Sequence, residues 1–202
     1  SMPPEVTAST GSDALCQAIE AYTSIGANAI TDALAYRAIA SIGAHLALAY
    51  EQPSNLDARE AMLVGSLMAG MAMASARLGG VHGMAHPLGS HFGIPHGVVC
   101  GLLLPYTMAY NLEYATAKYA RVAAAMGVAA PGMDEATAAR AAVDAVRDLL
   151  CRIRIPAHLG AFGVTEEAFD GIIAESLPSG SLQHNPRPLA AEDVRRILEA
   201  AL

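Results

Sequence analysis

Apolar residues recur at intervals of three and four positions along most of this chain, which is the spacing of one face of an α-helix. Leu15, Ile19 and Tyr22 show this period within residues 12–24, and the same period returns within residues 31–50. Two helices are therefore predicted over these ranges. The apolar stripe predicted for the second helix consists of Ile30, Leu34, Ile42 and Leu46.

Turn and capping residues divide the rest of the chain into further helices. Gln52-Pro53-Ser54 ends the second helix, and Ser54 with Asp57 three residues later resembles a capping box at the start of a third. Gly79 and Gly80 are predicted to close that third helix. The remaining helices are predicted over the histidine-containing segment after Gly80, then over residues 97–110 with a kink at Pro105, 114–126, 134–152, 165–176 and from 190 onward.

The composition agrees with one helical domain. The chain has 202 residues, enough for one substantial core, and its 53% hydrophobic but only 5% aromatic residues predict packing of small aliphatic side chains. Patterns typical of strands are nearly absent, so the predicted fold class is all-α. We expect a single domain over residues 1–202, with residues 1–10 as a leader whose Ser1-Met2 resembles a remnant of tag removal.

Charge and hydropathy exclude several classes of protein. A net charge of −7 without a cluster of Lys and Arg argues against nucleic-acid binding. No apolar run approaches the roughly 20 residues that cross a bilayer. A secretory signal pattern is also missing from the start of the chain. These features predict a cytoplasmic setting with neither nucleic acid nor membrane as a partner.

Histidines gather in one short segment. Four of the seven histidines lie within residues 82–96, and neutral imidazole is the commonest protein ligand for a transition metal. His82 and His86 are four residues apart, so they share one face of a helix. Pro95 ends that helix and allows His96 to return toward the same point from the next element. The segment is therefore a candidate metal site, although a lone buried histidine is more commonly hydrogen-bonded within a core.

A carboxylate that could complete this site lies near the start of the chain. Asp13 and Gln17 are four residues apart on a helix face different from that of Leu15 and Ile19. Two histidines with one carboxylate can hold a divalent ion and leave positions open for a substrate oxygen. Considered by itself, Asp13 is more typical of a helix start than of a metal site.

The other histidines and the cysteines are predicted to be structural. His45, His158 and His184 are isolated, and His91 lies off the face of His86, which favours a surface or supporting position. The three cysteines form no C-x-x-C pair and are expected to be reduced and mostly buried. They are Cys16, Cys100 and Cys151.

Several motifs are absent. No two glycines stand two residues apart, so the chain has neither a G-x-G dinucleotide fingerprint nor a P-loop. The G-x-S-x-G motif of serine hydrolases is missing too. The chain therefore shows neither a phosphate-binding glycine loop nor the nucleophile motif of a serine hydrolase.

At several points the sequence resembles the iron-containing (group III) alcohol dehydrogenases. The matching stretches are Asp-Ala-Leu at residues 13–15, Gly-Gly-Val-His-Gly-Met-Ala-His-Pro-Leu-Gly at 79–89, Ile-Pro-His-Gly at 94–97 and Leu-Leu-Leu-Pro at 102–105. The resemblance implies a dehydroquinate synthase-like helical domain, a multi-helix bundle, without the N-terminal α/β domain that binds the nicotinamide cofactor in that family.

The same resemblance implies roles for individual residues. The metal ligands, for Fe²⁺ or Zn²⁺, would be Asp13, His82 and His96, while His86 would lie close to the nicotinamide of NAD or NADP and to the substrate. The family pattern has a histidine four residues after the aspartate, where this chain has Gln17. Gln17 would coordinate weakly through its amide oxygen or orient a water.

The resulting hypothesis is metal-assisted hydride transfer between an alcohol or aldehyde and NAD(P), incomplete without a cofactor-binding domain. A homodimer, or association with such a domain, is the expected partnership. Two alternatives remain at this point. One is a metal-free reductase resembling the maleylacetate reductases, which the Gln17 departure allows. The other is a non-catalytic helical oligomerisation or binding module that keeps a vestigial site. Bound metal would count against the metal-free reductase. Cofactor binding by the purified chain would count against the non-catalytic module.

Overall fold

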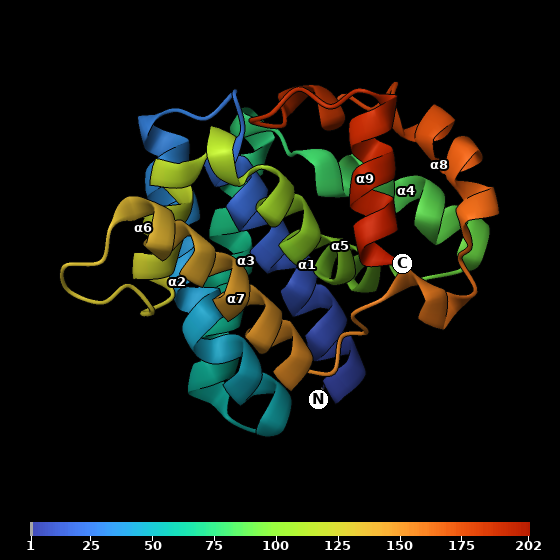
Figure 1. Ribbon diagram of the computed structural model, residues 1–202. Coiled ribbons are helices and arrows are strands. Elements are labelled where there is room, and N and C mark those ends of the chain that lie inside the picture. Colours follow the sequence, from blue (N-terminus) through green and yellow to red (C-terminus); the bar gives the residue numbers. More distant parts are fainter. Residues whose placement is uncertain (1) are drawn as a thin grey trace.

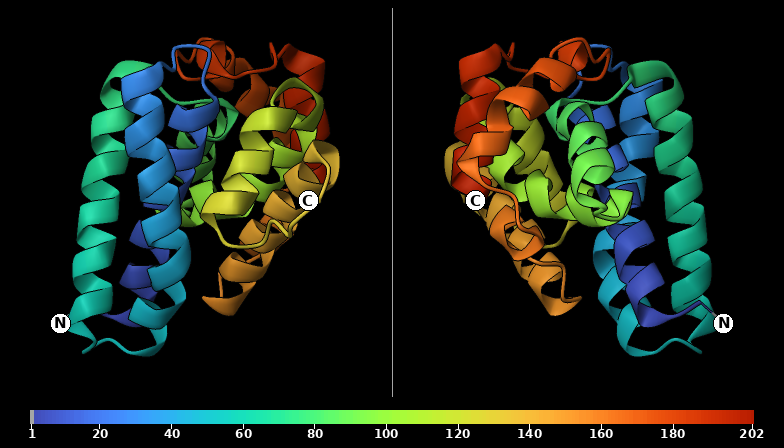
Figure 2. Two further views of the ribbon diagram at one scale, coloured as in Figure 1. Left: turned by 90° about the vertical axis from the view of Figure 1, so that its left-hand side faces the viewer. Right: turned by 90° about the vertical axis from the view of Figure 1, so that its right-hand side faces the viewer.

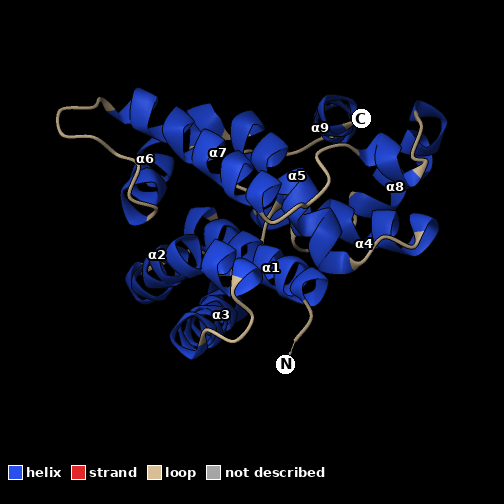
Figure 3. Cartoon of the chain, turned by 90° about the horizontal axis from the view of Figure 1, so that it is seen from below, coloured by secondary structure: helices blue, strands red, loops and turns tan. Residues whose placement is uncertain are grey.

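In the computed structural model, which describes residues 2–202, these residues form α-helices and short 3-10 turns without a strand (Figure 3). The predicted all-α class is confirmed. The helices are α1 (Pro4–Thr23), α2 (Ala29–Glu51), α3 (Leu56–Ala76), α4 (Gly80–Phe92), α5 (His96–Tyr110), α6 (Thr116–Ala125), α7 (Glu135–Arg152), α8 (Phe169–Ser176) and α9 (Ala191–Ala201).

Helix α1 runs through the middle of the molecule and packs against α2 and α3 on one side and α5 on the other (Figure 1). Helix α7 packs against α5 and α6, and α4, α8 and α9 gather at the opposite end. Since α1 contacts helices from both halves of the chain, its polar residues can meet side chains that lie far apart in the sequence.

Helices α2 and α3 lie side by side along one flank (Figure 2). They approach closely because the buried face of α3 is built from small residues, while Leu63, Leu67 and Met71 on its other face are exposed. The stripe predicted for α2 is buried at Ile42 and Leu46 but not at Ile30, which is 75% exposed in the first turn of the helix. The small buried residues of α3 are Ala58, Gly65, Ala69, Ala72 and Ala76.

Helix α1 begins at Pro4 and not at Ser12. Proline suits a first helical turn, where its missing N–H costs no hydrogen bond, and the Thr7 hydroxyl donates to the carbonyl of Pro3 at 3.1 Å. Thr7 and Ala8 are buried. Residues 4–10 of the predicted leader therefore belong to the core helix; Ser1, part of the predicted tag remnant, lies outside the described residues.

Both ends of α3 also differ from their predictions. The N-cap of α3 is Asn55, whose side chain accepts from the N–H of Ala58 at 3.1 Å, so Ser54 does not cap this helix. Helix α3 ends at Ala76, and Arg77 follows with a φ of 66°. Gly79 is the N-cap of α4, so the glycine pair starts the histidine helix and does not close the preceding one.

Two glycines let α5 approach α1. A Cβ on Gly97 would lie 2.1 Å from the carbonyl oxygen of Ser9, and a Cβ on Gly101 would lie 2.9 Å from the Cβ of Ser12. Any larger residue at Gly97 would force the two backbones apart. This crossing places the first turns of α5 beside Asp13.

A test of length and apolarity finds no single helix in the described residues that could cross a membrane. The bent pair formed by α3 and α4, which meet at 105°, passes the same test jointly.

Candidate metal centre

Side chains that can bind a metal ion meet where α1, α4 and α5 come together. Asp13 Oδ1 on α1 lies 3.2 Å from His82 Nε2 on α4 and 3.6 Å from His96 Nε2 at the start of α5. Cys100, one turn further along α5, joins them, and one potential ligand atom from each of the four residues lies within 4.8 Å of the others. The structure thus brings the predicted Asp13, His82 and His96 into one cluster.

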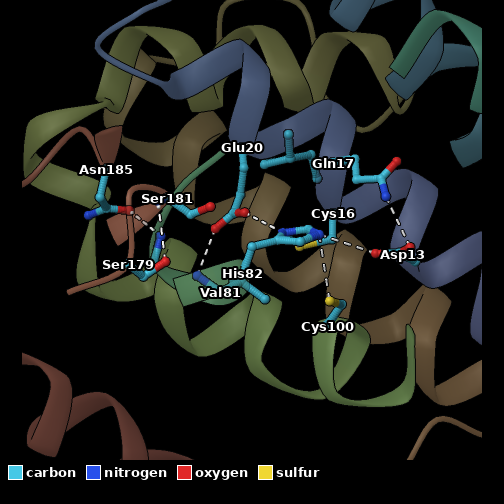
Figure 4. Close-up of polar contacts among 12 residues, drawn as sticks. Asp13, Cys16, Gln17, Glu20, Val81, His82, Cys100, Ser179, Ser181 and Asn185 are labelled. Carbon is cyan, nitrogen blue, oxygen red and sulfur yellow. Dashed lines mark hydrogen bonds and ion pairs between the residues drawn. The ribbon is translucent and has the colours of Figure 1, made fainter. Parts of the chain in front are cut away.

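His82 is held between two carboxylates of α1 (Figure 4). Its Nδ1 lies 2.6 Å from Glu20 Oε2, and its Nε2 faces Asp13. Because Glu20 accepts a hydrogen bond from Nδ1–H, Nε2 is the nitrogen left for a metal ion. Carboxylates that orient metal-binding histidines in this way are common in metalloproteins.

Glu20 also fixes the start of α4. Its Oε1 accepts from the N–H of Val81 at 2.7 Å, and the side chain of Asn185 accepts from the N–H of Gly80 at 3.1 Å. A carboxylate at a helix N-terminus interacts favourably with the helix dipole. A Cβ on Gly79 would lie 2.9 Å from Glu20 Oε1, so a larger residue there would displace the Glu20 carboxylate. The position of His82 therefore depends on this capping arrangement.

The ionisable side chains of the cluster stabilise one another in their charged forms. Burial would lower the pKa of His82, but hydrogen bonds with Asp13, Cys100 and Glu20 outweigh it and raise that pKa to about 12. Burial would raise the pKa of Asp13, yet its hydrogen bond with His82 and the charges of His82 and His96 bring that pKa below its usual value. Without a metal, the site holds a proton on His82 that a divalent cation would replace.

Two cysteines adjoin the cluster. Cys100 Sγ lies 3.5 Å from His96 Nε2 and 3.8 Å from His82 Nε2. A hydrogen bond from Cys16 lowers the pKa of Cys100 most, and this effect together with those of the two histidines outweighs burial. Burial, followed by the neighbouring Cys100, raises the pKa of Cys16. Cys16 and Cys100 are buried as predicted, whereas Cys151 is exposed.

Gln17 and His86 are placed differently from the cluster. Gln17 Nε2 donates to Asp13 Oδ2 at 3.0 Å, so the amide is bound to the carboxylate (Figure 4). His86 is exposed one turn beyond His82 on α4 and lines an open hollow of about 310 Å³ with Glu175 and Ser179. The functions predicted for these two residues remain predictions.

The remaining histidines lie elsewhere. His91 Nε2 lies 2.7 Å from Glu175 Oε1 in an exposed contact, in agreement with its predicted surface position. His45 and His184 each contact a backbone carbonyl four residues earlier in the chain, and His158 is exposed. None of these four belongs to the cluster.

Glu20 and Cys100 were not predicted as site residues. Glu20 is seven residues, or two helical turns, after Asp13, and Cys100 is four residues after His96. Both spacings place the residue on the same helix face as a predicted ligand. The sequence therefore contains a signal for Glu20 and Cys100. Glu20 lies among buried apolar residues of α1, and Cys100 within an apolar run, where both resemble core positions.

The chain matches one family over nearly its whole length. The C-terminal model of the Fe-containing alcohol dehydrogenase family covers residues 7–202. Escherichia coli lactaldehyde reductase is 42% identical over 200 residues, covering 99% of this chain and 52% of that enzyme. The chain belongs to the Fe-containing alcohol dehydrogenase family, and it spans about half the length of the curated relatives that it matches.

Solved structures of an oxidoreductase and a reductase also match this chain over its whole length. A crystal structure of 1,3-propanediol oxidoreductase superposes with a TM-score of 0.98 at 42% identity, covering 100% of this chain and 53% of that one. The sulfoacetaldehyde reductase of Bifidobacterium kashiwanohense, solved in complex with NAD⁺, superposes with a TM-score of 0.88 at 31% identity, covering 100% of this chain and 51% of that one. The predicted domain type, the helical C-terminal domain of this family, is thereby confirmed.

Proposed function

We propose that this chain is the metal-binding half of an alcohol dehydrogenase, which transfers hydride between a small alcohol or aldehyde and NAD(P) together with a cofactor-binding domain. The observation that carries the proposal is the convergence of Asp13, His82 and His96 from three helices. The names of the relatives, a lactaldehyde reductase and a propanediol oxidoreductase, support the substrate class. A cytoplasmic setting and a homodimer remain predictions.

The donor set suits a divalent ion. One carboxylate and two imidazoles are ligands that both iron(II) and zinc accept. The site is open on one side, since the side chain of His96 is 53% exposed and that of Asp13 is 23% exposed, against 8% for His82. When bound, the ion would act as a Lewis acid that polarises the oxygen of the substrate.

The protein residues have separate tasks. Glu20 keeps the proton of His82 on Nδ1 and so presents Nε2 to the site. Gln17 holds Oδ2 of Asp13, which leaves Oδ1 directed at both histidines. The exposed His86 is available to contact the substrate or nicotinamide and to relay a proton between them and solvent. Because the cluster faces solvent at His96, a second domain can cover it and exclude water.

Elemental analysis of the purified protein tests the metal site. We expect about one divalent ion per chain in the wild type and loss of it in His82→Ala and His96→Ala. His91→Ala is the matched control, because His91 is an exposed histidine of α4 outside the cluster. Full occupancy in both ligand variants would show that the site is wrongly assigned, and a metal-free wild type would favour the metal-free reductase.

Cofactor binding gives the second test. The described helices provide no glycine-rich turn of the kind that holds a pyrophosphate, so we expect no tight binding of NAD or NADP to this polypeptide alone in calorimetric titration. Turnover of an alcohol by this chain by itself would contradict the need for a separate cofactor domain. Absence of hydride transfer even when the chain is joined to such a domain would favour the non-catalytic module.

A further inference from the structure

We propose that Cys100 is the fourth protein ligand of the metal centre, and that its thiolate fills the role which a histidine at the position of Gln17 has in the family pattern. This inference rests on the proposed function, because it requires a divalent ion at Asp13, His82 and His96. It assigns the site a sulfur-containing ligand set and therefore a preference among metals.

The distances between the ligand atoms fit a tetrahedral set of four protein ligands around one ion, which can expand to five-coordination when a substrate oxygen binds. With metal–nitrogen and metal–oxygen bonds of about 2.0 Å and a metal–sulfur bond of about 2.3 Å, neighbouring ligand atoms are separated by about 3.3 to 3.6 Å. Cys100 Sγ lies 3.5 Å from His96 Nε2 and 3.8 Å from His82 Nε2. Asp13 Oδ1 lies 3.2 and 3.6 Å from the same two nitrogens. Four edges of the expected tetrahedron are therefore already present to within a few tenths of an ångström.

The backbone brings Cys100 to this position. Cys100 and His96 are one turn apart on α5, so their side chains share a face. Gly97 and Gly101 let that part of α5 press against α1 at Ser9 and Ser12, next to Asp13. Cys100 is fully buried, and its sulfur points at His82 (Figure 4). A hydrophobic core position alone would not need a sulfur directed at two imidazole nitrogens.

The competing ligands are engaged elsewhere. The amide nitrogen of Gln17 donates to Asp13 Oδ2, which makes Gln17 a positioning residue for that carboxylate. The sulfur of Cys16 lies 3.8 Å from His82 Nδ1, the nitrogen that Glu20 binds at 2.6 Å. A separation of 2.6 Å suits a direct hydrogen bond and leaves no room for an ion between the two atoms. Cys16 therefore lies beside Nδ1 of His82, the nitrogen that faces away from the ion, and its thiol donates to the sulfur of Cys100.

The chemistry selects the ion. The cysteine binds a metal as the thiolate, any proton that the ion displaces from the cluster passes to solvent, and the cysteine contributes a negative charge that a histidine does not. Thiolate is a soft ligand, which favours zinc over magnesium and, by the general order of stability, over iron(II). With Asp13 and Cys100 both ionised, the two negative charges of the ligand set balance the charge of the ion.

Cobalt(II) is the probe that tests this ligand, because a thiolate bound to cobalt produces a charge-transfer absorption in the near ultraviolet that nitrogen and oxygen ligands do not. Reduced, metal-free protein is titrated with Co²⁺ under anaerobic conditions. We expect this band at one ion per chain in the wild type and in two matched controls, Cys16→Ser and Cys151→Ser. The band should disappear in Cys100→Ser, with a fall in zinc affinity of more than about 100-fold.

A second variant guards against misfolding. Gln17→His in the Cys100→Ser background restores the family's own ligand pattern, so it should recover zinc affinity without the sulfur band. If the Cys100 variants do not fold, as judged by circular dichroism, the band in Cys16→Ser still identifies Cys100, because Cys151 is exposed and outside the cluster.

The outcomes separate this inference from the proposed function. Stoichiometric Co²⁺ in the wild type without the band, or a band that persists in folded Cys100→Ser, overturns the cysteine ligand and leaves the metal site standing. Failure of the wild type to bind Co²⁺ or Zn²⁺ at all overturns both.

Discussion

The metal centre has a buried side and an open side that are built differently. On the buried side, His82, Glu20 and the N-terminus of α4 are joined by short hydrogen bonds, and the side chains of His82 and Glu20 are only 8% and 6% exposed. On the open side, His96 is half exposed. The difference indicates that the buried side sets the geometry of the cluster and also stabilises the fold; in the function proposed above, the open side would serve ligand exchange and contact with substrate.

Replacing Glu20 tests the buried side and should have the largest effect. Glu20→Ala leaves His82 and the Val81 N–H without their acceptor, and breaking a buried charged pair costs about 3 to 5 kcal/mol. We expect a comparable loss of unfolding free energy in urea denaturation and a metal affinity weaker by about 10- to 100-fold, as is typical of supporting carboxylates. Glu175→Ala, which removes only an exposed pair with His91, is the control. Equal stability of the two variants would contradict the structural role of Glu20.

Replacing His96 tests the open side. His96→Ala should weaken zinc binding by about 100-fold or more, because it removes one of the proposed ligands. Its effect on the metal-free protein should be below about 1 kcal/mol, since exposed polar contacts contribute little. Isothermal titration with Zn²⁺ and urea unfolding of the same metal-free sample measure the two quantities. A loss of stability as large as that of Glu20→Ala would remove the distinction between the two sides.

The two sides of the site also differ in how far the sequence predicts them. Helical periodicity is enough to locate most helices, and the spacing of His82 and His96 around Pro95 is enough to predict a metal site. Glu20 could not be predicted in the same way, because its partner, the start of α4, is about sixty residues away in the chain and local patterns do not register that separation. The early start of α1 was missed for a similar reason, since burial of Thr7 depends on tertiary packing.

The pH dependence of metal binding tests whether His82, on the buried side, is protonated in the metal-free protein. The raised pKa of His82 means that the metal-free site holds a proton up to a pH of about 12, so an ion must displace it. Zinc affinity should therefore rise with pH, by at least about tenfold per unit between about pH 6 and 8. The stability of the metal-free protein should change with pH in the opposite direction. Protonated His82, paired with Asp13 and Glu20, contributes its full stabilisation below the unfolded pKa of about 6.5, and this contribution is lost as pH rises toward 12. Zinc affinity that does not change over this range would contradict a protonated His82.

The smallest expected effect concerns Gln17. Gln17→His on the otherwise unchanged chain should tighten binding of zinc and iron(II) only a few-fold and leave magnesium unaffected, because imidazole is the better donor but the other ligands remain. Competition with a chromophoric chelator measures the change. Gln17→Ala is the companion variant, and it should weaken binding slightly through loss of the hydrogen bond to Asp13. Unchanged or weaker affinity in Gln17→His would show that residue 17 does not point at the ion.

The cap on helix α4 extends the metal site to a distant part of the chain. Asn185, in the loop before α9, accepts from Gly80, and its side chain exchanges two hydrogen bonds with that of Asn111 just after α5. His82 follows Gly80 by only two residues, so we expect metal binding at His82 and order in the loop that holds Asn185 to be coupled. Zinc should therefore slow amide hydrogen exchange at Gly80 and across residues 182–187, and cleavage of that loop by a protease should speed the release of the ion.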